Sequence, residues 1–233
     1  MHTPRKMQLL EIEYQERSGL RDRDWYTIFF SRLCPADLLV LGINPGGDPL
    51  KPKDIIRAST RYYENWEHEY VDCRYPIQEV MLPFLKNILS TDNEGVRRIP
   101  KSNLAFRRSP GEAKFKNRHK MTLAKGMQEA RQTVEEILTF VGPKMVLLEC
   151  MKPEKFRGLY CSGPAVPLRD NVYTQFKKSD VRVFYAALMH VKSLDRSIPI
   201  VAVGHPSHFG KKPVWGASVV PATRKLVQEY DVR

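Results

Sequence analysis

Several features that would mark other classes of protein are missing from this 233-residue sequence. Neither Gly-x-x-x-x-Gly-Lys-Ser/Thr nor Gly-x-Gly-x-x-Gly occurs, which argues against a nucleotide-binding α/β enzyme, because such loops cradle phosphates. The few cysteines form no Cys-x-x-Cys pair and have no His-x-x-x-His partner, so we expect reduced thiols and no metal site; they are Cys34, Cys73, Cys150 and Cys161.

Long apolar runs are missing as well. No stretch approaches the ~20 apolar residues that a membrane span needs. Residues 1–20 alternate charged and apolar side chains and lack the apolar stretch of a signal peptide. We therefore expect a cytoplasmic protein that has no association with a membrane.

Acidic residues are in deficit, with 26 Asp and Glu against 38 Lys and Arg and a formal net charge of +12. Such a surplus is typical of proteins that neutralise phosphates, although a generally basic surface would also produce it. The 42% of hydrophobic residues is enough for a substantial core. We expect one domain over residues 1–233 and a monomer; the charge favours a nucleic acid as the partner but cannot name it.

The spacing of apolar residues predicts the secondary structure. Helices are predicted over residues 7–17, 24–33, 80–90, 122–140 and 214–230, and strands over 37–43, 144–150, 198–204 and a short stretch within 98–106. Residues 180–185 fit either a strand or the start of a helix ending near His190. Residues 109–120 are predicted to be a basic loop, and the long polar segment 158–178 is either a surface loop or part of a ligand pocket. Strands that alternate with helices predict a three-layer α/β/α fold with a mostly parallel central sheet, whose ligand site lies at the carboxyl ends of the strands.

Two of the predicted strands end in loops that carry chemistry. The first ends in Gly42-Ile43-Asn44-Pro45-Gly46, and the last ends in Gly204-His205-Pro206-Ser207. Each loop alone is a weak signal, because Asn-Pro-Gly is a common turn and a histidine after a strand is often structural. Because both loops should open at the same edge of the sheet, we expect them to meet in one site.

This pair of motifs resembles the uracil-DNA glycosylase superfamily, whose first motif has a Gly-x-Asp/Asn-Pro core and whose second has a His-Pro-Ser core. The Asn version followed by Gly is similar to the mismatch-specific and single-strand-selective branches. The resemblance covers roughly residues 37–215 but does not extend clearly into 50–80 or 158–191. It implies a uracil-DNA glycosylase-like fold and hydrolysis of the N-glycosidic bond of a flipped-out pyrimidine, without a cofactor, leaving an abasic site.

The resemblance also implies catalytic roles. Asn44 matches the residue that orients the attacking water, and a neutral amide must act by positioning because it is a poor base. His205 matches the histidine that donates a hydrogen bond to the pyrimidine carbonyl as the bond breaks. Asp48 is either a helper carboxylate or a turn-capping residue.

Other positions bear on the base. Gly46 stands where the uracil-specific members place a Tyr that excludes thymine, and Gly47 opens the loop further. The pocket is therefore expected to admit uracil or 5-modified pyrimidines, including bulky modified cytosines of the kind found in phage DNA. Asn103 matches an Asn that reads the Watson–Crick edge, or else caps a strand end. Tyr62 and Tyr63 are candidates for an aromatic floor, or else core residues.

The resemblance implies double- or single-stranded DNA as the partner, and a last group of residues is expected to contact it. Phe209 lies where the family inserts a Leu wedge into the base stack, although His208 could be the wedge instead, or neither residue. Ser207 is expected to contact a backbone phosphate. The basic residues that flank the expected DNA path are Lys211, Lys212, Arg107 and Arg108, followed by the basic segment that ends at Lys120. The alternative is a DNA-binding module that keeps this fold without turnover.

Overall fold

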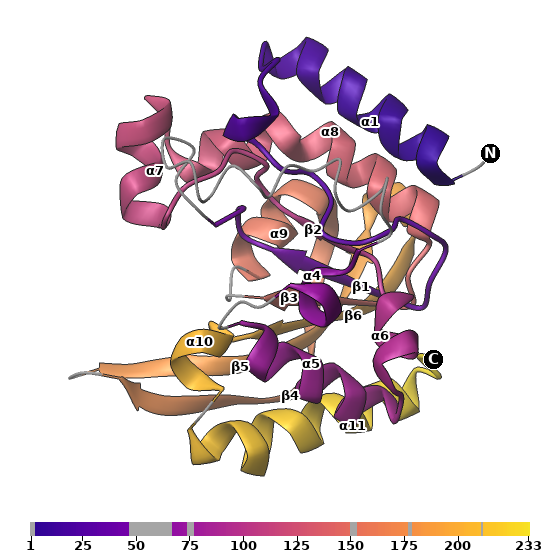
Figure 1. Cartoon of the computed structure of the whole chain (residues 1–233). Helices are drawn as coiled ribbons and strands as arrows, with labels where there is room; N and C mark the ends of the chain where they lie inside the picture. Colours follow the sequence, from indigo (N-terminus) through magenta and orange to yellow (C-terminus); the bar gives the residue numbers. More distant parts are fainter. Residues whose placement is uncertain (1–2, 47–66, 74–76, 150–152, 177–178, 211) are drawn as a thin grey trace.

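The computed structural model describes residues 3–46, 67–73, 77–149, 153–176, 179–210 and 212–233 (Figure 1). These residues form a six-stranded sheet with the order β2-β1-β3-β6-β5-β4. Its strands are β1 (Leu38–Gly42), β2 (Lys101–Asn103), β3 (Met145–Glu149), β4 (Cys161–Phe176), β5 (Ser179–Val191) and β6 (Arg196–Val203). The strands β2, β1, β3 and β6 run parallel, and the β4–β5 hairpin continues the sheet antiparallel. The prediction of an α/β fold with a mostly parallel sheet is confirmed.

Helices cover both faces of this sheet, because its central strands are apolar on both sides (Figure 1). One face packs against α1 (Thr3–Ser18), α7 (Glu112–His119), α8 (Leu123–Val141) and α9 (Pro153–Tyr160). The other packs against α4 (Glu69–Asp72), α5 (Gln78–Leu89), α6 (Asn93–Arg97), α10 (Pro206–Phe209) and α11 (Val220–Glu229). No helix in the described part of the chain is long and apolar enough to cross a membrane.

The prediction of a helix over residues 24–33 is wrong. Only a short 3₁₀ turn, η1 (Arg23–Trp25), forms there. The chain then runs extended beside the edge of β2, where Thr27 N donates to Phe106 O at 2.9 Å and Phe30 N donates to Lys101 O at 3.0 Å. Residues 26–31 are buried without a break, so the apolar spacing reflects a segment buried on all sides rather than one face of a helix.

The predictions of loops over residues 109–120 and 158–178 are also wrong. Within residues 109–120 the chain forms α7, in which Phe115 anchors the segment against Gly126 of α8 while Lys114 and Lys116 are exposed. Within 158–178 it forms the end of α9 and then β4, the edge strand of the described sheet, whose side chains are mostly exposed. The ambiguous stretch over 180–185 belongs to β5.

The predicted carboxyl-terminal helix is present but in two parts. A π-helical turn, η3 (Trp215–Val219), leads directly into α11, with Pro221 in the first turn. Pro221 has no N–H to donate within this helical run, and it follows the π-helical turn, where the regular α-helical hydrogen bonding is interrupted.

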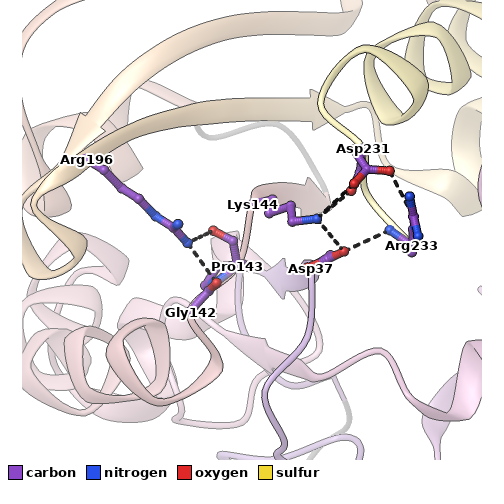
Figure 2. A network of polar contacts seen from close by, with 7 residues as sticks. All are labelled: Asp37, Gly142, Pro143, Lys144, Arg196, Asp231 and Arg233. Atoms are coloured by element: carbon purple, nitrogen blue, oxygen red, sulfur yellow. Dashed lines mark hydrogen bonds and ion pairs between the residues drawn. The ribbon is translucent and has the colours of Figure 1, made fainter.

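Charged residues gather where the strands begin, at the amino edge of the sheet (Figure 2). There Lys144 Nζ lies 3.0 Å from Asp37 Oδ2 and 3.5 Å from Asp231 Oδ2. Arg233 N donates to Asp37 Oδ2 at 3.1 Å, and Arg196 donates to the carbonyl oxygens of residues 142 and 143. This amino-edge network ties the carboxyl terminus to the starts of β1 and β3.

Candidate active site

The carboxyl ends of the four parallel strands line up in one row. Gly42 at the end of β1 is in register with Asn103 of β2, and Glu149 at the end of β3 is in register with Val203 of β6. Since Leu41 is in register with Leu148, Gly42 also lies beside Glu149. We call Asn103, Gly42, Glu149 and Val203 the end row. Both loops identified in the sequence leave from it, with Asn44 two residues after β1 and His205 two residues after β6.

The loop after β1 is fixed by hydrogen bonds to the segment after β2. Asn44 Nδ2 donates to Pro45 O at 2.9 Å and to Ser109 O at 3.3 Å. Ser109 N donates to Pro45 O at 3.0 Å in return. The side-chain amide of Asn44 therefore has a defined orientation, held from two segments that are distant in sequence.

Asn103 is buried over the glycine that ends β1. A Cβ atom placed on Gly42 would lie 2.2 Å from Asn103 Oδ1, so only glycine leaves room for this amide. Asn103 is 2% exposed, and among the described residues its Nδ2 atom has no hydrogen-bond partner. A buried amide donor without a partner is costly, which makes this position a candidate for contact with a ligand.

His205 lies at the start of the short helix α10. Its carbonyl accepts hydrogen bonds from His208 N at 2.9 Å and Phe209 N at 3.0 Å. Burial lowers the pKa of His205 below its ordinary value, His208 lowers it further, and the negative charge of Glu149 opposes the shift. A neutral imidazole is therefore favoured at pH 7, with one ring N–H to donate.

The aromatic residues of α10 differ in exposure. Phe209 is packed against Phe176 at the end of β4, with ring centroids 5.3 Å apart, and is only 6% exposed. Its ring also fills the space beside Gly204. His208 is exposed and lies 4.8 Å from the His205 ring. Of the two candidate wedges, His208 is therefore the one at the surface.

The predicted DNA-contacting arginines point into the protein. Arg107 makes a bidentate pair with Glu129 of α8, with its closest contact at 2.7 Å. Arg108 is 1% exposed, and its carbonyl contacts His119 Nε2 at 2.7 Å. Both arginine side chains are therefore largely buried. Exposed basic side chains occur instead on α7, at Lys114 and Lys116.

Several of the predicted residues cannot be placed. Asp48, Gly47, Tyr62, Tyr63 and Lys211 lie outside the described residues, as does the side chain of Ser207. Gly46 is exposed, and no described atom lies within 4 Å of a Cβ built on it. Lys212 Nζ donates to Gln175 O at 3.0 Å, which ties the segment after α10 to the β4–β5 hairpin.

A buried charged cluster beside the end row was missed from the sequence. Lys101 Nζ forms an ion pair with Glu69 of α4 and lies 3.4 Å from Glu149 Oε2. The hydroxyl of Tyr70 donates to the same Glu149 oxygen. The Lys101 ammonium also lies over the Phe30 ring, 4.7 Å from its centroid. One signal was present in the sequence: a glutamate ends the apolar run of β3.

These residues supply hydrogen-bond donors and acceptors at one edge of a sheet, which is the usual place for a ligand in this class of fold. Among the described residues, no group of three or more His, Cys, Asp and Glu side chains is placed to hold a metal ion. The three described cysteines, Cys34, Cys73 and Cys161, are free thiols. Compared with known proteins, the chain matches no family model and no curated protein.

Proposed function

We propose that this chain is a DNA glycosylase of the uracil-DNA glycosylase type. It would hydrolyse the N-glycosidic bond of a flipped-out uracil or 5-modified pyrimidine, including a bulky modified cytosine, and leave an abasic site. The observation that carries the proposal is the common origin of the Asn44 and His205 loops at the end row. The motifs in these loops resemble the two catalytic motifs of that superfamily.

The geometry of Asn44 suits a residue that positions water. Its Nδ2 atom is held by two carbonyl oxygens, at 2.9 and 3.3 Å, so the plane of the amide is fixed. An amide oxygen held in this way can accept a hydrogen bond from a water molecule and orient it toward the sugar carbon. Fixed placement of a nucleophile lowers the barrier without a strong base.

The environment of His205 suits a residue that stabilises the departing base. Burial lowers its pKa, so the ring is neutral near pH 7 and donates one N–H to a pyrimidine carbonyl. A donor that is already in place when charge develops needs no reorganisation during the reaction. This role requires neither a metal nor a cationic histidine.

DNA as the substrate is supported by charge. The formal net charge is +12, and α7, which follows the segment bonded to Asn44, presents exposed Lys114 and Lys116. Lysines on such a surface neutralise phosphates without reading sequence. Among the described residues, no atom within 4 Å of a Cβ built on Gly46 would obstruct a 5-substituent.

One observation favours a second candidate, a DNA-binding module without turnover. Phe209, at the position of the family wedge, is buried and packed against Phe176, so it cannot fill a gap in the base stack without leaving its contacts. A protein that does not expel a nucleotide would not need a wedge.

Release of free base from oligonucleotides separates the two candidates. The panel contains duplex and single-stranded DNA with uracil, thymine mismatches or bulky 5-modified cytosines. We expect the wild type to release at least one of these bases, and Asn44→Ala and His205→Ala each to lower the rate by about 10²- to 10³-fold, the usual cost of losing a preorganised group. Tight binding by the wild type without release of any base would make the non-catalytic module the correct description.

A further inference from the structure

Two polar side chains flank Gly42 on one face of the sheet. Side chains two residues apart on a strand share a face, so Asn103 points to the same side as Lys101. Lys101 Nζ lies 3.4 Å from Glu149 Oε2, which places Glu149 on that side as well. Adjacent strands are about 4.8 Å apart, so the backbones of Asn103 and Glu149 are separated by roughly 10 Å across a residue that has no side chain.

Glu149 is an unusual residue to find at this place. It is 4% exposed, as part of an otherwise apolar strand. A buried ion pair generally stabilises a protein no more than apolar residues of the same volume would. Its charge also acts on His205, because it opposes the lowering of the pKa of that histidine by burial. The carboxylate is therefore both costly and close to the residue expected to hold the base.

The two flanking groups differ in what they can recognise. An amide such as Asn103 has a donor and an acceptor and can match either a uracil-type or a cytosine-type edge by rotating. A carboxylate only accepts, and Tyr70 and Lys101 both present donors to it. Cytosine carries an amino donor at position 4, whereas uracil carries a carbonyl acceptor there. Glutamate accepts from the cytosine amino group in established recognition patterns, and two acceptors repel each other.

We propose that Glu149 is the specificity-determining residue of this site and that it selects cytosine-type bases, which carry a 4-amino group, over uracil-type bases. The inference rests on the proposed glycosylase function and narrows its substrate class. Lys101 and Tyr70 are positioning residues that hold the carboxylate at the end row.

The test uses two substrates that differ only at position 4, oligonucleotides containing 5-hydroxymethylcytosine or 5-hydroxymethyluracil. Base release is measured in single-turnover reactions, and affinity is measured with non-hydrolysable 2′-fluoro versions of both. We expect the wild type to favour the cytosine substrate by about 10- to 100-fold, the range for one good base contact. Glu149→Gln should reverse the preference, because its amide can donate to the uracil carbonyl.

Glu69→Gln is the matched control. It removes the other carboxylate from the same Lys101 ammonium but belongs to α4, outside the end row. It should preserve the ratio between the two substrates, whatever it does to stability. Thermal unfolding of both variants separates effects on folding from effects on recognition.

The possible failures are distinguishable. If bases are released but the wild type prefers the uracil substrate, or if both variants leave the ratio unchanged, the role of Glu149 is wrong and the glycosylase function stands. A second outcome is that no base is released, but the wild type binds the 2′-fluoro cytosine oligonucleotide more tightly than the uracil one and Glu149→Gln reverses this preference. The glycosylase function is then wrong, and the role of Glu149 in recognising cytosine stands. Absence of both release and binding preference overturns both.

Discussion

The two edges of the central sheet hold charge in different ways. At the amino edge, Lys144 pairs with Asp37 and Asp231 through side chains that are 39%, 28% and 63% exposed (Figure 2). At the carboxyl edge, Lys101 pairs with Glu149 through side chains that are 4% and 5% exposed. Exposed pairs stay hydrated and contribute little, whereas buried charges carry a large desolvation cost. The buried charges of Lys101 and Glu149 lie beside two candidate catalytic loops, and their desolvation cost is more easily explained by a role in function than by a role in stability.

Removing one lysine from each edge should give the largest contrast. Lys101→Met removes the ammonium that pairs with the buried carboxylates of Glu69 and Glu149, so we expect a loss of about 3–5 kcal/mol in the free energy of unfolding. Lys144→Met at the amino edge leaves its partners in water, and we expect almost no change. Urea denaturation of both variants measures the difference. Equal losses for the two variants would show that the edges do not differ in this respect.

The pH dependence of stability should come from a buried histidine rather than from the exposed amino-edge network. Burial lowers the pKa of His68, the N-cap of α4, from 6.5 to about 4. As the pH falls from about 6.5 to about 4, the unfolded chain takes up a proton that the folded chain excludes, so this contribution to stability is present above pH 6.5 and is lost across that window. The expected slope is at most about 1.4 kcal/mol per pH unit.

Urea midpoints between pH 7 and pH 4 test this expectation. His68→Asn keeps a side chain able to cap a helix and should flatten the slope in that window. His190→Gln, near the amino edge at the end of β5, should retain it. If the slope of stability against pH is the same in His68→Asn as in the wild type, the pH dependence comes from other groups.

The fold was largely predictable from the sequence because its central strands are continuous apolar runs, which are buried on both faces in a parallel sheet. The segment over residues 24–33 was mispredicted because it is buried on every side, so its apolar residues carry no period that separates a helix from an extended chain. For α7 and β4, the deciding contacts are with the next element along the chain, α8 and β5, and the apolar spacing within α7 or β4 alone does not reveal them.

The candidate site was predictable only in part. Asn44 and His205 stand in recognisable loops, and parallel strands bring those loops to one edge. Glu149 carries no local motif, and its place beside Gly42 depends on the register of β1 and β3. The inward orientation of the Arg107 side chain likewise depends on its ion pair with Glu129 of α8. No sequence motif connects these two residues.

The smallest expected effect concerns the glycine in the end row. In Gly42→Ala, the new Cβ would lie 2.2 Å from Asn103 Oδ1, so the amide must move. We expect base release to fall by about tenfold, which corresponds to about 1.4 kcal/mol in the barrier. Gly158→Ala on α9, where no described atom lies within 4 Å of the added Cβ, is the control and should leave base release unchanged. Full activity in Gly42→Ala would show that the position of Asn103 is not critical.

The most direct test of the glycosylase proposal compares one histidine from each edge. Single-turnover base release is measured for the wild type, His205→Ala and His190→Ala on the substrate that the wild type cleaves best. If His205 stabilises the departing base, its removal lowers the rate by about 10²- to 10³-fold, while His190→Ala keeps the wild-type rate. Equal rates for all three proteins would contradict a catalytic site at the carboxyl edge of the sheet.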